Sequence, residues 1–311
     1  MYNPTKPYKD EIVSLVRQTW ETPYALVKDG VLYKKFFYPE FHHADGVGTK
    51  GIYHWKRRTF KNAVLDAMAM NLNDMLMARA MPYALIDHVF LPRDDKDAIL
   101  GILSSLVLEC RERQIVIPRG ETAIHDTQEG LEIGIAMLGF VKEIKANELQ
   151  VGDLLVGFTS NGLHSNGFTK VRELFGEEPR PEFIFPTKIY FKNVWSLLDK
   201  INIHGMMHIT GGAFTKLKDI LPPDADINIG SNYNLRPHRI FYEIYGHGIT
   251  DEEMYQTFNC GIGFILGMSK YDAIQYLPML HSLDAEIIGE VVPGAGVIKI
   301  QSKFSGREIC Y

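Results

Sequence analysis

The segment Asp45-Gly46-Val47-Gly48-Thr49-Lys50 places a carboxylate, two glycines and a lysine within one short stretch. Glycines let backbone amides approach an anion closely, the Lys50 ammonium can neutralise phosphate charge, and Asp45 can hold a divalent metal ion. The segment therefore predicts a contact with nucleotide phosphates. An ordinary glycine turn is the alternative.

The same segment matches the G-x-G-x-x-G pattern of dinucleotide-binding folds through Gly46, Gly48 and Gly51. That fold needs a helix that begins at the glycines and receives the pyrophosphate. The residues that follow, 52–58, lack the pattern of an amphipathic helix. Because that helix is missing and no Walker A loop is present, we reject both nucleotide-binding motifs for this segment.

A second source of carboxylates is the stretch 60–80, which predicts a helix that is apolar nearly all round and therefore buried. Its polar residues Asp66, Asn73 and Asp74 fall near one face, because Asn73 and Asp74 each lie about two helical turns after Asp66. A buried carboxylate is costly unless it is paired or binds a cation. The helix thus predicts delivery of Asp74, with Asp66 as a second candidate, to a magnesium ion. Helix capping or an internal ion pair is the alternative.

Glu121 follows a short predicted strand and can complete an oxygen-rich metal shell with Asp45 and Asp74. A plain loop explains this residue equally well.

Two further segments, 160–167 and 208–212, each lie between a predicted strand and a predicted helix. Free amides and the helix dipole bind anions at such places. In the first segment, Ser165 or Asn166 is equally suited to be a helix N-cap. With these two anion seats and the Lys50 segment, the chain can hold two phosphorylated ligands.

Two histidine patterns carry less weight. His204 and His208 have metalloprotease spacing, but Gly205 stands where the catalytic Glu would be required. The adjacent His42 and His43 have no third metal ligand nearby in the sequence. We interpret both pairs as structural.

The predicted strands and helices that position these residues alternate along the sequence, which indicates α/β or α+β layering. The predicted helices are 60–80, 97–113, 165–175, 192–200, 213–221, 250–257 and 270–280, and the predicted strands are 83–91, 114–117, 131–142, 154–159, 206–210 and 261–268. A polar stretch at 142–151 separates two domains, 1–145 for nucleotide, metal and dimerisation and 146–311 as a C-terminal domain.

Composition narrows the class of protein. The 311 residues are 46% apolar and 23% charged, which is typical of a globular protein with a core. A net charge of −5 argues against a nucleic-acid partner. The three cysteines offer no disulfide framework. The N-terminal residues 1–7 have no apolar leader, and no apolar run suits a membrane span, so we expect a cytoplasmic protein without membrane contact.

Taken in order, the motifs resemble those of the phosphoribosylformylglycinamidine cyclo-ligase (aminoimidazole ribonucleotide synthetase) family. The matching segments are Tyr8-Lys9-Asp10, 45–50, Asp66 through 69–70 to Asn73-Asp74, Asp87, 120–123, 164–168, 186–190, 208–212 and 257–263. They span the chain from about Asp45 nearly to its C-terminus.

The resemblance implies a two-domain fold, with an N-terminal mixed sheet and helices followed by a C-terminal α/β domain. It implies ATP-dependent ring closure of formylglycinamidine ribonucleotide in purine biosynthesis, through an iminophosphate, by a magnesium-dependent homodimeric ligase whose nucleotide site is near the subunit interface. Asp45, Asp74 and Glu121 would bind the metal ion, and His208, Lys50 and Asp45 would be catalytic. The implied ATP-binding residues are Asp45, Gly46, Thr49, Lys50, Asp66, Asn73, Asp87 and Thr122. The implied substrate-binding residues are Asn161, His164, Ser165, Asn166, Thr210, Gly211, Gly212 and Asn259.

Departures from the family pattern gather on the nucleotide side. Residues 11–44, where relatives carry a glycine-rich ATP lid, contain only Gly30. Arg119-Gly120 replaces a double glycine, Ile124-His125 replaces an acidic continuation, and Gly211-Gly212-Ala213 replaces a triple glycine.

Other enzymes share this architecture, among them selenophosphate synthetase, thiamine-monophosphate kinase, a hydrogenase-maturation protein and the glutamine-dependent enzyme one step earlier in the pathway. No cysteine precedes Cys110, which argues against the first, and Phe258-Asn259 with Gly261-Ile262-Gly263 favours the cyclo-ligase over the kinase. A related ATP-dependent enzyme with another substrate, or a non-catalytic nucleotide-binding homologue, is the alternative. Asp45, Lys50, Asp74 and Glu121 together argue against the latter.

Overall fold

The computed structural model describes residues 8–311. They divide into two compact units. The first comprises the described residues up to Ile144 together with Glu177–Pro186, and the second comprises Lys145–Gly176 and Thr187–Tyr311. The excursion of Glu177–Pro186 into the first unit differs from the single boundary that we expected from the sequence.

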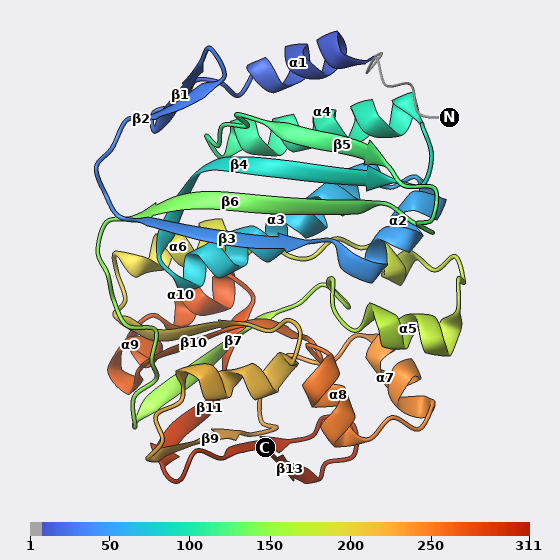
Figure 1. The fold of residues 1–311 in the computed structure, drawn as a ribbon. Coiled ribbons are helices and arrows are strands. Elements are labelled where there is room, and N and C mark those ends of the chain that lie inside the picture. The colour runs from blue at the N-terminus through green and yellow to red at the C-terminus, as the bar shows by residue number, and fades with distance from the viewer. Residues whose placement is uncertain (1–7) are drawn as a thin grey trace. The chain divides into compact units, whose positions relative to one another are not determined.

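The first unit is built on a mixed four-stranded sheet of order β3-β6-β4-β5, in which only β4 and β5 are parallel (Figure 1). Its strands are β3 (Glu40–Gly46), β4 (Ala80–Leu91), β5 (Gly120–Ile124) and β6 (Glu132–Val141), and a separate hairpin consists of β1 (Ala25–Lys28) and β2 (Val31–Lys34). Its helices are α1 (Lys9–Arg17), η1 (Gly48–Lys50), α2 (Gly51–Arg57), α3 (Phe60–Met77), α4 (Lys96–Glu112) and η2 (Pro181–Phe183).

One face of this sheet is covered by α3, which packs against β3, β6 and β4, while α4 packs beside α3. The helix was predicted correctly because its apolar side chains surround it, and Ala67, Met68 and Leu72 are fully buried. Beyond the β1–β2 hairpin, the other face is open: Ala44, Ile86, His88 and Ala136 alternate along their strands and are exposed. Within the described chain, the face opposite α3 is thus covered only in part, by the hairpin.

The second unit is built on a seven-stranded sheet of order β13-β12-β9-β11-β7-β10-β8, antiparallel except for β12 and β9. Its strands are β7 (Asp153–Thr159), β8 (Ile203–His208), β9 (Ala225–Ile229), β10 (Ile262–Ser269), β11 (Ala285–Pro293), β12 (Ile298–Gln301) and β13 (Glu308–Cys310). Its helices are α5 (Phe168–Phe175), α6 (Phe191–Leu198), η3 (Ala213–Ile220), α7 (Arg239–Gly246), α8 (Asp251–Thr257), α9 (Lys270–Gln275) and α10 (Leu277–Ser282).

Three local predictions need correction. A short helix, α2, does begin directly after Lys50, contrary to our interpretation of residues 52–58. The dinucleotide fold is still excluded, because β3 pairs antiparallel with β6 instead of lying in a parallel sheet. Residues 114–117 form only one isolated bridge, Ala84 to Val116, and the helix expected over 270–280 is two helices, α9 and α10.

Among residues 8–311, no helix combines the length and the apolar character that crossing a membrane requires. The sequence observation on residues 1–7 lies outside the described part of the chain.

Candidate functional site

A cavity of about 210 Å³ in the first unit lies between α1, α4 and the ends of β4 and β5. Its apolar wall is formed by Ile12, Val13 and Val16 of α1 and by Ile99 and Leu103 of α4. Its other lining residues include Tyr8, Lys9, Asp87, Asp94, Gly120, Glu121 and Thr122. An apolar wall with a few polar groups is the usual composition of a small-molecule site. The cavity therefore unites three residues that the sequence assigned to ATP or metal.

Asp87 is 3% exposed at the cavity wall, beside Gly120 on the neighbouring strand. Burial raises the pKa of Asp87 to about 7, and the nearby charge of Glu121 adds to this. A side chain at Gly120 would meet the Asp87 carboxylate, because its Cβ would lie 2.2 Å from Oδ1. The missing side chain at position 120 thus leaves room for a carboxylate held in an apolar setting.

The three predicted metal ligands take separate positions. Asp45 Oδ1 accepts a hydrogen bond from its neighbour's amide, Gly46 N, at 2.7 Å. Asp74 forms an ion pair with His43 at 3.1 Å. Glu121 lines the cavity. Within residues 8–311, no group of three or more His, Cys, Asp or Glu side chains is placed to hold a metal ion.

His43 joins Asp74 to Asn71 through both ring nitrogens. The Asn71 amide group donates to Asp45 O at 3.1 Å and Ala67 O at 2.9 Å, so its Oδ1 is left to accept from His43 Nδ1 at 3.1 Å. His43 Nε2 donates to Asp74 Oδ2, and this hydrogen bond is the main cause of the raised pKa of His43. Two acceptors at one ring favour the doubly protonated form of His43, in agreement with the direction of its pKa shift.

In the glycine segment, the Gly48 amide donates to Glu132 Oε1 at 3.2 Å. Glu132 is a residue that the sequence analysis missed, and burial raises its pKa. The anion beside these amides is therefore the protein's own carboxylate.

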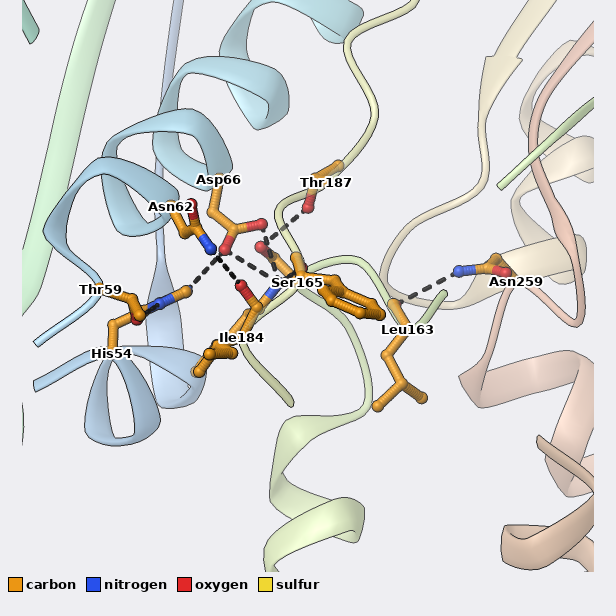
Figure 2. Close-up of polar contacts among 11 residues, drawn as sticks. His54, Thr59, Asn62, Asp66, Leu163, Ser165, Ile184, Thr187 and Asn259 are labelled. Carbon is orange, nitrogen blue, oxygen red and sulfur yellow. Dashed lines mark hydrogen bonds and ion pairs between the residues drawn. The ribbon is translucent and has the colours of Figure 1, made fainter. Parts of the chain in front are cut away.

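The structure places Lys50 away from any open phosphate seat. Its ammonium lies 3.0 Å from Asp66 Oδ1 and 2.9 Å from Oδ2, and both side chains are fully buried. His54 Nε2 lies 2.8 Å from the same carboxylate, and its Nδ1 contacts Thr59 Oγ1 at 2.8 Å (Figure 2). For Asp66, the alternative of an internal ion pair is the one realised. Of the other expected ATP contacts, Asn73 is fully buried in α3 and Thr49 is half-buried in η1.

In the second unit, three loops meet at one edge of the sheet. Strand β10 is antiparallel to both β7 and β8, pairing Ile262 with Thr159 and Phe264 with His208. The loop after β7, the loop after β8 and the loop before β10 therefore lie together. These loops carry all eight predicted substrate-binding residues, and fully buried His208 ends β8.

Asn259, 1% exposed, holds the loop after β7 in place. Its Nδ2 donates to Gly162 O at 2.8 Å and Leu163 O at 3.3 Å, and its Oδ1 accepts from Ser160 Oγ at 2.8 Å and Gly261 N at 3.0 Å. In the structure Asn259 fixes the backbone of residues 160–163, and its contact with substrate stays a prediction.

Three non-glycine residues on these loops have positive φ: His164 at 62°, Ala213 at 44° and Cys260 at 46°. Such conformations cost about 1–3 kcal/mol each and gather at functional sites. The ring of His164 packs against Gly263, where a Cβ would lie 2.5 Å from it. The third glycine of the family pattern is replaced here by Ala213, which keeps the left-handed conformation.

Polar side chains complete this edge. Ser165 Oγ contacts Thr187 Oγ1 at 3.1 Å, and neither Ser165 nor Asn166 caps α5. Asn166 is 9% exposed, and its Nδ2 lacks a hydrogen-bond partner within residues 8–311. A buried amide of this kind is a candidate ligand contact.

Lys216, which the sequence analysis missed, donates from Nζ to Thr210 Oγ1 at 3.1 Å. It lies one turn into η3, and this helix begins directly after Gly211 and Gly212. Gly212 has a left-handed backbone, and the space beside the Gly211 backbone is empty. A cation beside a glycine loop and a helix N-terminus suits an anion. Its position six residues after Thr210, on the predicted helix, was the signal that the sequence offered.

Comparison with known proteins identifies the class and then the family. The N-terminal domain of AIR synthase related proteins matches residues 41–141, and the C-terminal domain of the same class matches residues 150–300. The chain belongs to the phosphoribosylformylglycinamidine cyclo-ligase family. It is 36% identical to the cyclo-ligase of Saccharolobus solfataricus over 73% of this chain and 71% of that one. The cyclo-ligase of Pyrococcus furiosus is 32% identical over 82% of this chain and 79% of its own length.

Solved structures share the fold. HypE from E. coli, a hydrogenase maturation protein, superposes with a TM-score of 0.71 at 18% identity over 97% of this chain and 96% of that one. A thiamine-monophosphate kinase from Stenotrophomonas maltophilia gives a TM-score of 0.65 at 16% identity, covering 96% of both chains. The expected two-domain α/β architecture is thereby confirmed.

Proposed function

We propose that this protein closes the imidazole ring of aminoimidazole ribonucleotide from formylglycinamidine ribonucleotide, using ATP, in purine biosynthesis. Membership of the cyclo-ligase family is the observation that carries this proposal. The cavity in the first unit and the three loops of the second supply separate seats for a nucleotide and a ribonucleotide. A cytoplasmic location stays a prediction from the sequence.

The reaction has two steps. The formyl (amide) oxygen attacks the γ-phosphorus of ATP, ADP leaves, and an iminophosphate forms. The nitrogen on the amidine side then attacks that carbon, the C–O bond to phosphate breaks, and a proton is lost as phosphate departs. Phosphoryl transfer depends mainly on positioning and on stabilisation of charge. We assign substrate activation to His208 and substrate contacts to the loop residues around Asn161, His164 and Asn166.

On the nucleotide side we keep Asp45, Gly46, Asp87 and Thr122 as ATP contacts. We do not keep Lys50 as a phosphate ligand, because its ammonium is buried against Asp66.

Magnesium takes one or two carboxylates, and phosphate oxygens and waters complete its shell. The exposed Asp45 and the cavity residue Glu121 fit this donor set, whereas Asp74 is engaged with His43. Bound Mg²⁺ would neutralise phosphate charge. Glu121 is therefore the residue that we propose for it at the cavity, with Asp74 acting through His43. Asp45 lies on the opposite outer strand of the sheet and is proposed only as a separate phosphate-side contact.

The function is tested with purified protein, formylglycinamidine ribonucleotide, ATP and magnesium. We expect ADP and aminoimidazole ribonucleotide in equal amounts, and no ADP when the ribonucleotide is omitted. ADP release that ignores the ribonucleotide would point to a related enzyme with another substrate. ATP binding without any turnover would point to a non-catalytic homologue.

We further propose that two chains pair through the open face of the four-stranded sheet. Ile86 is 45% exposed at its centre, beside exposed Ala44 and Ala136. Ile86→Lys is expected to convert a homodimer to a monomer in analytical ultracentrifugation, because it places a charge in an apolar interface. Ile274→Lys, at an exposed site on α9, should leave the dimer intact. A dimer that persists in Ile86→Lys contradicts this interface.

Lys216 is expected to bind the phosphate of the ribonucleotide. Lys216→Ala should raise KM for the ribonucleotide by about 10- to 100-fold, because a charge-assisted hydrogen bond contributes about 1.5–3 kcal/mol. The kcat should change little, since the phosphate is remote from the ring that closes. Lys218→Ala, which removes an exposed lysine from the same helix, is the matched control. Equal KM values for the two variants would refute this role.

A further inference from the structure

Residues Glu177–Pro186, which we call the strap, belong to the first unit although the chain on both sides of them belongs to the second. The strap contains η2 and three internal backbone hydrogen bonds, from Arg180 N to Glu178 O, from Phe183 N to Arg180 O and from Ile184 N to Pro181 O. Amides bonded in this way are expected to exchange more slowly than open ones. Noncovalent side-chain and backbone contacts hold the strap on the first unit.

Those contacts are made with α2 and α3. Phe183 is fully buried, with its ring edge-on to Tyr53 at a centroid distance of 5.1 Å. Asn62 Nδ2 donates to Ile184 O at 2.9 Å, as Figure 2 shows. Lys56 forms an exposed ion pair with Glu177 at the start of the strap.

The contact nearest the end of the strap comes from Lys50, the last residue of the glycine segment 45–50. Lys50 Nζ donates to Phe185 O, and the same ammonium is paired with Asp66. An ammonium has three N–H donors, and the two Asp66 oxygens and Phe185 O are acceptors for them. The Lys50 side chain is fully buried. His54 holds the other side of the Asp66 carboxylate. A nucleotide phosphate would have to break this arrangement to reach Lys50.

We propose that Lys50, fixed by Asp66 and His54, anchors the strap and is a positioning residue of the proposed cyclo-ligase reaction. The strap ends at Pro186, and Phe185 lies two residues before Thr187, whose hydroxyl contacts Ser165 on the substrate loop of the second unit. Two residues of chain reach at most about 7 Å, so fixing Phe185 O restricts where Thr187 can go. The anchor thereby limits the freedom of the Ser165 loop. The catalytic consequence rests on the proposed function, but the anchoring does not.

The test compares three variants by hydrogen exchange of the strap, with mass spectrometry of a peptide that contains Phe183 and Ile184. Lys50→Met removes the anchor, Asn62→Ala removes one neutral strap contact, and Lys56→Ala removes only the exposed ion pair. We expect exchange to quicken by about tenfold or more in Lys50→Met, by less in Asn62→Ala, and not in Lys56→Ala. Unchanged strap exchange in Lys50→Met overturns the proposal, whatever Asn62→Ala shows. If Lys50→Met does not fold, Asp66→Asn takes its place, because this change removes the carboxylate that fixes the Lys50 ammonium, and unchanged strap exchange in that variant overturns the proposal.

A second measurement separates positioning from phosphate binding. The dissociation constant of magnesium-ATP, measured by calorimetry, should change by less than about threefold in Lys50→Met, while KM for the ribonucleotide rises by about tenfold or more. Loss of ATP affinity by about 100-fold with normal strap exchange would make Lys50 a phosphate ligand instead. Because strap exchange needs no turnover, an inactive wild-type protein would refute the proposed function and leave the anchor open to its own test.

Discussion

Asp87→Asn is expected to raise the free energy of unfolding at pH 8 by up to about 4 kcal/mol. Burial raises the pKa of the Asp87 carboxyl from 3.8 to about 7. Above pH 7 both the folded and the unfolded states carry the charged carboxylate, and the folded state bears the full cost of burying it. A neutral amide of the same shape avoids that cost.

The gain should depend on pH in a defined direction. The folded-state pKa is raised, so the unfolded state releases its proton first as pH rises from about 4 to 7, and wild-type stability falls across that window. Below about pH 4 both states are protonated and the advantage of asparagine disappears. Urea unfolding at pH 4, 6 and 8 measures this difference.

Asp94→Asn is the matched control, because Asp94 lines the same cavity but is exposed. It should give no comparable gain at any pH. The Asp87→Asn variant should also bind ATP more weakly, as expected where a residue is kept for function at a cost in stability. A stability gain that is the same at pH 4 and pH 8 would contradict a buried charge as its cause.

The elements that the sequence predicted well are those with long, continuous runs of apolar residues. Helix α3 is apolar all round, and β4 is a long buried run, so both were predicted within three residues of their ends. Helix α2 was missed because it has only seven residues and buries Gly51, Tyr53 and His54, which do not form an apolar stripe. The excursion of the strap was missed because its cause lies in contacts with α2 and α3, far away in sequence.

The candidate site divides in the same way. The loops after β7 and β8 and before β10 were found because each motif lies next to a strand or helix that sequence patterns reveal. Partners distant in sequence were not found: Glu132 reaches the Gly48 amide across 84 positions. For Asp66 the sequence requires a positive partner but cannot distinguish a metal ion from the Lys50 ammonium, since either satisfies a buried carboxylate. Only the distance between the two side chains decides.

Asp66→Asn is expected to lower the free energy of unfolding at pH 7 by about 3–5 kcal/mol, because it leaves a buried ammonium without its counter-charge. Asp66 and Lys50 are both fully buried. Burial already lowers the pKa of Lys50, and the Asp66 charge opposes that shift. Without the carboxylate the pKa of Lys50 falls further, and the folded protein has to release the proton that the unfolded chain keeps.

This mechanism gives the variant a characteristic pH dependence. The unfolded lysine titrates near 10.4, so between neutral pH and about 10 the unfolded state of the variant binds more protons than the folded state. Its stability should therefore recover as pH rises toward about 10, relative to the wild-type protein. Unfolding in guanidinium chloride at pH 7, 8.5 and 9.5 tests this recovery.

Asp95→Asn supplies the comparison, because the ion pair of Asp95 with Arg58 is partly exposed and asparagine can still cap α4. Exposed pairs contribute about 0–1 kcal/mol, so this variant should lose little stability and show no recovery at high pH. If Asp66→Asn behaves in the same way, the buried pair does not hold the first unit together. A large loss that recovers with pH would instead show that Asp66 acts on stability through the Lys50 charge.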